Sequence, residues 1–342
     1  MEYAVNVPKI QQSALCGKEL TIMAKCVYLV RDEGERIKEI LAQKGYEIIV
    51  SNGKLDDSAL ARCDAIVPGK AYITAEVLDK APNARIVSKF GVGMDRTDID
   101  ACTARGIYAA NTPTANFVSV AEHTVALMLA AAKKVAQISR CMHHDSPDWD
   151  GARLFQGIEL SGKTLTLIGF GNIGGRVAKL LSGFEMRILA YDPYTPEDRV
   201  PEYVELTRDL DYALSQGDFV SIHVAGTAST KGLIGEHELA QMKKSAIIVN
   251  TTRGFVIDEP ALIVALQNSV IAGAALDVFT QEPLGPGNPL MTMENVVATP
   301  HNAANTPEAR LRAQIDCAEN IIQCFEEGRP RRALNNPADP RK

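Results

Sequence analysis

Four residues in the second half of the chain have side chains suited to holding a small acid and moving a proton. Arg253, Asp277 and His301 each follow a run of β-type apolar residues, and Glu282 lies in the loop after Asp277. An arginine can hold a carboxylate in a planar fork and polarise a carbonyl group. A histidine can transfer a hydroxyl proton near neutral pH, and a carboxylate behind it fixes its tautomer and favours its charged form. If the strand ends meet, the set suits hydride transfer to a 2-oxo acid.

A glycine pattern indicates where the hydride comes from. The apolar run 165–168 leads into Gly169, Gly171 and Gly174, spaced G-x-G-x-x-G, and then into a helical pattern. These glycines permit a tight turn, close approach to a pyrophosphate and packing of the helix on the strand, while the helix N-terminus attracts phosphate. A second apolar run ends in Asp192, 18 residues beyond Gly174, where an acid binds the ribose hydroxyls of a dinucleotide. Because an acid disfavours a 2′-phosphate, the pattern predicts NAD rather than NADP.

The elements that position these residues follow from the alternation of apolar runs and amphipathic stretches. In the first part of the chain, strands are predicted at 26–30, 47–50, 65–67, 85–88 and 106–110, with helices at 34–44, 74–80 and 98–105. From residue 163 a second series of strand-like runs ends near Gly169, Asp192, His223, Asn250, Asp277 and Thr299. Strands that alternate with helices predict parallel sheets with helices on both faces, which bind ligands at the carboxyl ends of their strands.

Three other segments complete this reading of the chain. Residues 118–136 are apolar nearly all round a helix, which is typical of a helix buried at a domain or subunit junction. Residues 307–328 carry an apolar stripe at helical spacing. Residues 1–22 are expected to form a loosely held extension, and the proline-rich basic tail after Pro330 is expected to fray.

The composition narrows the class of protein. The 342 residues suffice for two domains, and 46% hydrophobic with 23% charged residues is ordinary for a globular protein. A net charge of -6 argues against a nucleic-acid or membrane partner, and we expect no signal peptide. Seven cysteines, with no C-x-x-C pair, favour reduced thiols and therefore the cytoplasm. His143 and His144 beside Asp145 have no third ligand at helical spacing, so no metal site is predicted.

Several motifs together resemble one family. They are Gly-Val-Gly-Met-Asp from residue 91, Val-Ala-Glu-His-Thr from 120, Gly-Phe-Gly-Asn-Ile-Gly from 169, Asn-Thr-Thr-Arg-Gly from 250, Ala-Leu-Asp-Val-Phe-Thr-Gln-Glu-Pro-Leu from 275 and Thr-Pro-His from 299. Over residues 25–335 the chain resembles the D-isomer-specific 2-hydroxyacid dehydrogenases. The resemblance implies a flavodoxin-like substrate domain (23–117 and 305–335), a Rossmann NAD-binding domain (118–304), a tail (336–342) and an active site in the cleft between the domains. It also implies a homodimer built largely through the NAD-binding domain.

The resemblance assigns roles to individual residues. The catalytic arginine, glutamate and histidine correspond to Arg253, Glu282 and His301. The carboxamide of the cofactor would be bound by Asp277, and the substrate carboxylate by Gly91, Val92 and Gly93 together with Arg253. The full set expected to bind the cofactor is Gly169, Gly171, Asn172, Ile173, Gly174, Asp192, His223, Thr251, Thr252, Asp277 and Ala303.

The size of the substrate follows from one departure from the family. Phosphoglycerate dehydrogenases carry an arginine where this chain has Pro68, and proline has neither a cationic side chain nor an N–H to bind a phosphate. We therefore expect an unphosphorylated short acid, glyoxylate or hydroxypyruvate, although Lys70 lies nearby and could hold a phosphate. D-3-phosphoglycerate dehydrogenase remains the alternative. Formate dehydrogenases resemble this family but have glutamine in place of Glu282. An alternative of a different class is an NAD-sensing module that resembles the corepressors of this family and recruits partners.

Overall fold

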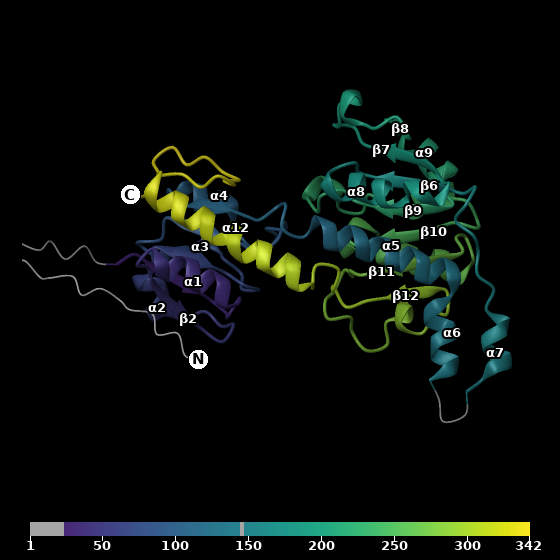
Figure 1. The fold of residues 1–342 in the computed structure, drawn as a ribbon, viewed down its shortest axis with the longest axis horizontal. Helices are drawn as coiled ribbons and strands as arrows, with labels where there is room; N and C mark the ends of the chain where they lie inside the picture. Colours follow the sequence, from purple (N-terminus) through teal and green to yellow (C-terminus); the bar gives the residue numbers. More distant parts are fainter. Residues whose placement is uncertain (1–23, 144–146) are drawn as a thin grey trace, which may run out of the picture.

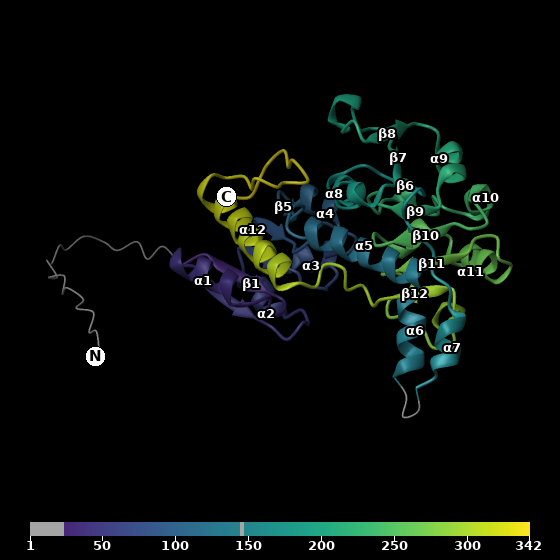
Figure 2. The same ribbon diagram turned by 45° about the vertical axis from the view of Figure 1, so that its right-hand side comes forward.

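The computed structural model describes residues 24–143 and 147–342, which form two parallel sheets with helices on both faces of each (Figures 1 and 2). The first sheet has five strands in the order β2-β1-β3-β4-β5 and the second has seven in the order β12-β11-β10-β9-β6-β7-β8. The first order is that of flavodoxin-like sheets and the second that of Rossmann sheets. The predicted fold class, two doubly wound parallel-sheet domains, is confirmed.

The first sheet is covered by helices from both ends of the chain. Its strands are β1 (Cys26–Leu29), β2 (Glu47–Val50), β3 (Ala65–Val67), β4 (Ile86–Ser88) and β5 (Tyr108–Ala110). The helices α1 (Glu35–Gln43) and α12 (Pro307–Glu326) pack on one face. The other face is covered by α2 (Asp57–Arg62), α3 (Ala75–Asp79) and α4 (Ile99–Ala104). Because β1, β3 and β4 are buried on both faces, they read as continuous apolar runs rather than as alternating patterns.

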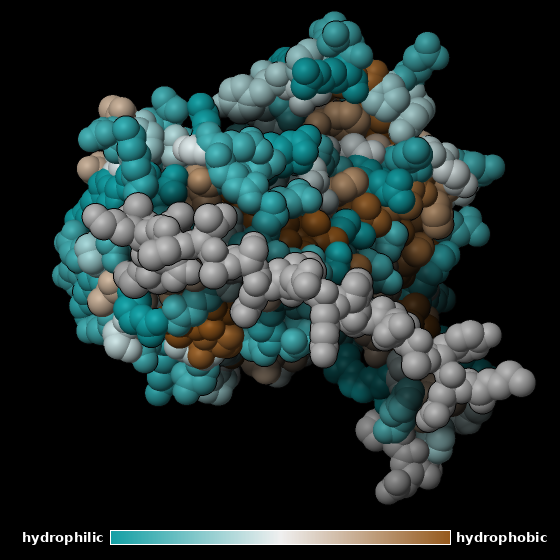
Figure 3. All heavy atoms as spheres, turned by 60° about the vertical axis from the view of Figure 1, so that its left-hand side comes forward, coloured by the Kyte–Doolittle hydropathy of each residue, from teal (hydrophilic) through white to brown (hydrophobic). Residues whose placement is uncertain are grey.

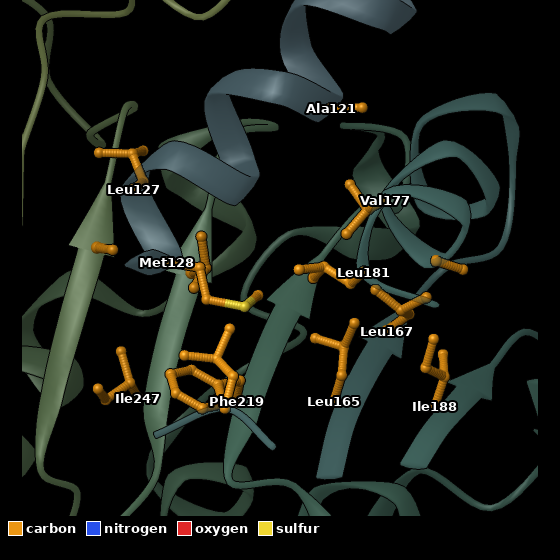
Figure 4. Packing of buried hydrophobic residues seen from close by; sticks show 14 of the residues in the cluster. Ala121, Leu127, Met128, Leu165, Leu167, Val177, Leu181, Ile188, Phe219 and Ile247 are labelled. Atoms are coloured by element: carbon orange, nitrogen blue, oxygen red, sulfur yellow. The ribbon is translucent and has the colours of Figure 1, made fainter. Parts of the chain in front are cut away.

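The second sheet contains the glycine turn. Its strands are β6 (Thr164–Ile168), β7 (Arg187–Tyr191), β8 (Val204–Thr207), β9 (Phe219–Ile222), β10 (Ile247–Asn250), β11 (Gly273–Leu276) and β12 (Val296–Ala298). The helices α5 (Phe117–Lys133) and α8 (Asn172–Leu181) cover one face, and Figure 4 shows their apolar side chains packed over strand residues such as Leu165 and Phe219. The other face carries α9 (Leu210–Gln216), α10 (Glu236–Gln241) and α11 (Glu259–Gln267).

The remaining helices are short. Figures 1 and 2 show α6 (Val135–Met142) and α7 (Trp149–Leu154) extending away from the second sheet. The single-turn 3-10 helices are η1 (Ser182–Phe184), η2 (Glu197–Arg199), η3 (Ala228–Thr230), η4 (Gly254–Val256) and η5 (Pro289–Met291). On the face shown in Figure 3 the surface is mostly hydrophilic, with hydrophobic side chains gathered in a few separate areas. Within the described residues, no helix is long and apolar enough to span a bilayer.

Three expectations about the elements are wrong. The strand β8 was not predicted from the sequence, because only Val204 of its four residues is buried and the apolar pattern is weak. The helix expected over 118–136 ends at Lys133, since Lys134 adopts a left-handed conformation with φ of 56° and α6 begins after it. The tail after Pro330 is anchored rather than frayed. Its Leu334 N–H donates to Ala109 O of β5 at 2.8 Å.

The last residues of the chain are anchored in the same way. The Arg341 side chain donates to the carbonyls of Ala81 and Ala84, at 2.8 and 3.0 Å, and the Arg341 N–H donates to Gly106 O. The side chain of Pro337 is also buried. A proline-rich, basic composition indicates a lack of core-forming residues, but it carries no signal for these hydrogen bonds to distant carbonyl groups.

Candidate active site

The residues predicted to do chemistry follow three neighbouring strands of the second sheet. Since β10, β11 and β12 are parallel and paired in register, their carboxyl ends lie at one edge, where Arg253, Asp277 and His301 follow them. There the structure places His301 Nδ1 2.7 Å from Glu282 Oε2. The second oxygen of Glu282 accepts from the Phe279 N–H at 3.2 Å, which holds the carboxylate in its own loop. With Nδ1 facing the carboxylate, Nε2 of the half-exposed imidazole is left to meet a ligand.

Hydrogen bonds to Asp277 hold the loop that contains His301. The backbone of His301 is left-handed, with φ of 53°, a conformation that costs energy for any residue with a Cβ. It is held by a hydrogen bond of 2.7 Å from its N–H to the Asp277 carbonyl. The Asp277 carboxylate accepts from the N–H groups of Asn302 and Ala303, at 2.8 and 2.9 Å, and from the Thr299 hydroxyl at 2.6 Å.

Asp277 is fully buried in this arrangement. Burial by itself raises the pKa of the Asp277 carboxyl, but hydrogen bonds from His123, Thr299, Asn302 and Ala303 together outweigh it and hold the pKa below its usual value. The carboxylate therefore stays charged and orders the loop. The Ala303 N–H is used inside the loop, and the predicted contacts of Asp277 and Ala303 with a cofactor remain predictions.

Arg253 connects the two halves of the molecule. Its Nε donates to Asp95 Oδ2 at 2.9 Å and its Nη1 donates to Thr252 O at 2.7 Å. A Cβ at Gly93 would collide with Nη2, so glycine is required for the guanidinium to lie against this loop. The guanidinium keeps N–H groups on Nη1 and Nη2 free for an anion. The loop 91–95, which follows β4 of the first sheet, is thereby brought to the carboxyl edge of the second.

The predicted substrate loop is only partly available to a ligand. The Gly91 N–H donates to Thr112 Oγ1 at 2.7 Å and so has a partner inside the protein, and the expectation that it holds a substrate carboxylate remains a prediction. The N–H groups of Val92 and Gly93 make no hydrogen bond to another described residue. They remain as candidates beside Arg253.

The glycine turn between β6 and α8 has the shape that a dinucleotide needs. Gly169 has φ of 100°, and a Cβ there would lie 2.8 Å from the backbone of His223 and Val224. A Cβ at Gly174 would collide with the Gly169 carbonyl, whereas one at Gly171 would point into open space. Gly171 precedes α8 without any side-chain cap, so no described side chain occupies the first N–H groups of the helix, on Asn172 and Ile173. A pyrophosphate fits such a cradle.

Asp192 lies beside the same turn. Its Oδ2 accepts from the Phe170 N–H at 2.8 Å, and its Oδ1 accepts from Tyr194 and Thr195 at 2.8 and 2.9 Å. Burial raises the pKa of the Asp192 carboxyl, but these hydrogen bonds lower the pKa by a larger amount. The pKa therefore lies below its usual value. The charged carboxylate is thus fixed where the sequence predicts contact with a ribose.

The other residues expected to bind the cofactor make contacts within the protein. His223 Nε2 lies 2.9 Å from Ser221 Oγ, its buried Nδ1 has no partner among the described residues, and burial lowers its pKa to about 3. The Thr251 hydroxyl pairs with that of Thr124 at 2.9 Å, and the Thr252 hydroxyl donates to Asn250 at 3.0 Å. Their roles as cofactor ligands remain predictions.

The sequence singled out Lys70 but passed over other charged residues near the strand ends of the first sheet. Lys70 is exposed, and its carbonyl accepts from Arg96 at 2.8 Å. Lys89 instead extends to the Gly69 carbonyl, and burial lowers its pKa. Glu33 is 6% exposed, lies 3.5 Å from Arg31 Nε, and has its pKa raised by burial. The signal for Lys89 and Asp95 was their place directly after or near a buried strand at a ligand-binding edge.

The histidines at the end of α6 are the residues that the sequence considered for a metal. No group of three or more candidate ligands lies together within residues 24–143 and 147–342. His143 Nδ1 lies 2.7 Å from the carbonyl of Ser139, while His144 and Asp145 lie outside the described residues.

Comparison with known proteins agrees with this geometry. Residues 125–303 match the profile of the family described as D-isomer specific 2-hydroxyacid dehydrogenase, NAD binding domain. A D-3-phosphoglycerate dehydrogenase of Archaeoglobus fulgidus is 39% identical, over 89% of this chain and 58% of that protein. A glyoxylate reductase of Thermofilum pendens is 44% identical, over 77% of this chain and 78% of that protein. The structure of a NADPH-dependent glyoxylate/hydroxypyruvate reductase of Sinorhizobium meliloti, solved with NADP and malonate, has a TM-score of 0.83 at 27% identity and covers 93% and 99% of the two chains.

The fold and the glycine turn define a protein with a nicotinamide dinucleotide as its cofactor. More narrowly, the chain belongs to the D-isomer-specific 2-hydroxyacid dehydrogenase family, as its motifs predicted. It spans 58% of the length of the two archaeal phosphoglycerate dehydrogenases that it matches.

Proposed function

We propose that the protein is an NAD-dependent oxidoreductase that interconverts a small D-2-hydroxy acid and the corresponding 2-oxo acid. The observation that carries the proposal is the contact of 2.7 Å between His301 and Glu282. This pair lies at the same edge of the second sheet as Arg253 and the glycine turn between β6 and α8. A bound nicotinamide supplies or accepts the hydride. Part of the proposal is that the first sheet belongs to a substrate domain and the second to the cofactor domain.

The protein's own residues divide the remaining work. Arg253, with the N–H groups of Val92 and Gly93, would hold the substrate carboxylate and polarise the C2 carbonyl. His301 would donate its Nε2 proton to the C2 oxygen during reduction and take it back during oxidation. Glu282 would keep the imidazole oriented through its contact with Nδ1.

We infer that the substrate is unphosphorylated, with glyoxylate and hydroxypyruvate favoured. A phosphate dianion needs several fixed donors. Pro68 supplies none, Lys70 is exposed, and the ammonium group of Lys89 already binds the Gly69 carbonyl near the buried carboxylate of Glu33. The second candidate is 3-phosphohydroxypyruvate, which is favoured by the 39% identity to a phosphoglycerate dehydrogenase and by Arg31, Lys89 and Arg96 near the same edge.

A substrate panel tests both the activity and its specificity. NADH oxidation would be followed with glyoxylate, hydroxypyruvate, pyruvate and 3-phosphohydroxypyruvate at equal enzyme concentration. We expect the highest kcat/KM with glyoxylate or hydroxypyruvate. A higher value with 3-phosphohydroxypyruvate would establish the second candidate. The absence of turnover with all four acids, despite NADH binding, would instead favour a cofactor-sensing module.

Cofactor choice is predicted to depend on Asp192. Its carboxylate would accept hydrogen bonds from the ribose hydroxyls of NAD and repel a 2′-phosphate. We expect Asp192→Ala to weaken NADH and improve NADPH, so that the preference narrows by about tenfold or more. Arg208, whose guanidinium lies against the carbonyls of Asp192 and Thr195, would then be the nearest cation to a 2′-phosphate. The measurement is kcat/KM with each cofactor, and equal wild-type values would refute the role of Asp192.

We also propose a homodimer located in the cytoplasm. The six described cysteines are all free, which agrees with a reducing compartment. The helices α6 and α7 expose apolar side chains, with Val135, Trp149 and Leu154 at 55%, 61% and 81%. We expect Leu154→Glu to convert dimer to monomer in sedimentation velocity, whereas Leu311→Glu, at an exposed position of α12, should leave the dimer intact. A wild-type protein that sediments as a monomer would contradict the proposal.

A further inference from the structure

The helix α5 carries three polar side chains that contact the loops of the candidate active site. Ser119, His123 and Thr124 lie near the N-terminus of α5, a helix that is mostly apolar. Ser119 Oγ lies 2.8 Å from Thr306 Oγ1, and Thr124 Oγ1 lies 2.9 Å from Thr251 Oγ1. The helix is therefore hydrogen-bonded both to the segment that follows His301 and to the segment that precedes Arg253.

The third side chain, His123, contacts Thr299 and Asp277, which hold the loop that contains His301. His123 Nε2 lies 3.0 Å from Thr299 Oγ1 and 3.5 Å from Asp277 Oδ1. The Thr299 hydroxyl donates its single proton to Asp277 at 2.6 Å, so it must accept from His123. The Nε2 of His123 therefore carries a hydrogen, and this side chain is a donor to the pair formed by Thr299 and Asp277.

The same Asp277 determines the backbone conformation around His301. Its carbonyl accepts from the His301 N–H, and its carboxylate accepts from the two residues that follow His301. The left-handed φ of His301 persists only because these hydrogen bonds compensate for it. A change in the position of the Asp277 carboxylate would therefore move the imidazole.

We propose that His123 is a positioning residue, which holds His301 in its reactive orientation through Thr299 and Asp277. The inference rests on the proposed role of His301 as the acid and base. His123 reaches no reacting atom itself. It fixes the direction of the Thr299 hydroxyl and supplies a donor to a carboxylate that is fully buried.

Loss of the His123 donor is expected to change kcat much more than KM. The substrate carboxylate would be bound by Arg253 and the loop of the first sheet, neither of which contacts His123. Loss of the His123 donor should therefore lower kcat by about tenfold to a hundredfold, since small displacements of a reacting group have effects of this size, while the KM of the 2-oxo acid changes little.

Two substitutions of His123 test the donor itself. His123→Leu removes the N–H and keeps an apolar side chain of similar bulk, whereas His123→Gln keeps an N–H near the position of Nε2. We expect the low kcat in His123→Leu and recovery to within about threefold of wild type in His123→Gln. Glu122→Gln, at the exposed neighbouring position of α5, is the matched control and should not change kcat. A leucine variant with the wild-type kcat, or a folded glutamine variant as slow as the leucine variant, would overturn the proposal.

Thr299 gives an independent arm that does not depend on the folding of His123→Leu. Thr299→Val should lower kcat as His123→Leu does, and Thr299→Ser should preserve it. In the double variant, His123→Leu should add less than about threefold to the effect of Thr299→Val, because both changes break one chain of contacts. Full additivity of the two effects would overturn the proposal that His123 acts through Thr299.

A measurement without turnover separates this inference from the proposed function. Hydrogen exchange of the segment 299–306 should be about tenfold faster in His123→Leu than in wild type, because the N–H groups of Asn302 and Ala303 donate to Asp277. If exchange and kcat are unchanged in an enzyme that still requires His301, only the inference about His123 fails. If His301→Ala keeps full activity, the proposed function of His301 fails instead.

Discussion

The substitution His301→Ala is expected to lower kcat by about 10²–10⁴ while NADH binding stays nearly unchanged. The imidazole is the proposed proton donor to the C2 oxygen, and its only described side-chain partner is the Glu282 carboxylate at 2.7 Å. Among the described side chains, its removal deprives only the Glu282 carboxylate of a partner, and the Glu282 side chain is itself 32% exposed. The loss should therefore appear in the chemical step rather than in stability.

The measurement combines steady-state kinetics with a fluorescence titration of NADH. His237→Ala is the matched control, because His237 is an exposed histidine that lies 3.4 Å from Asp211, a carboxylate on the protein surface. A His301→Ala enzyme within a few-fold of the wild-type kcat would show that another group transfers the proton.

The second large effect is expected for Arg253→Lys, which should lower kcat/KM by about 10²–10³. Lysine keeps the positive charge but cannot reproduce a planar fork, nor can it satisfy Asp95 and the Thr252 carbonyl while holding an anion. Loss of two charge-assisted hydrogen bonds to the substrate corresponds to about 3–4 kcal/mol, which is the stated factor.

Two controls test whether the loss in Arg253→Lys comes from weaker binding of the substrate carboxylate. Arg36→Lys on α1, where the arginine pairs with Glu39 at the surface, should leave kcat/KM unchanged. Removal of the substrate carboxylate offers a second check, since acetaldehyde in place of a 2-oxo acid should be reduced poorly by wild type and by Arg253→Lys alike. A lysine variant as efficient as wild type would argue that the Val92 and Gly93 N–H groups alone bind the carboxylate.

The sequence by itself determined the fold class and the identity of the central side chains. Parallel strands buried on both faces appear as short continuous apolar runs, so most strands and the carboxyl ends that bind ligands could be located from the pattern alone. The glycines at 169 and 174 have conformational and steric requirements that only glycine meets. The pairing of Glu282 with His301 was predictable because both follow neighbouring strand ends.

The sequence could not determine which residues distant along the chain meet in the fold, because local patterns carry no information about such contacts. Arg253 meets Asp95 over 158 residues, and His123 meets Thr299 over 176. A periodic pattern reports only whether a position is buried, and His123 on an apolar helix therefore read as a structural residue. The anchored tail and the Gly91 N–H used by Thr112 were missed for the same reason. Each depends on hydrogen bonds whose geometry is set only when helices and sheets pack at fixed distances. That packing decided which of the groups predicted to bind a ligand already have a partner inside the protein.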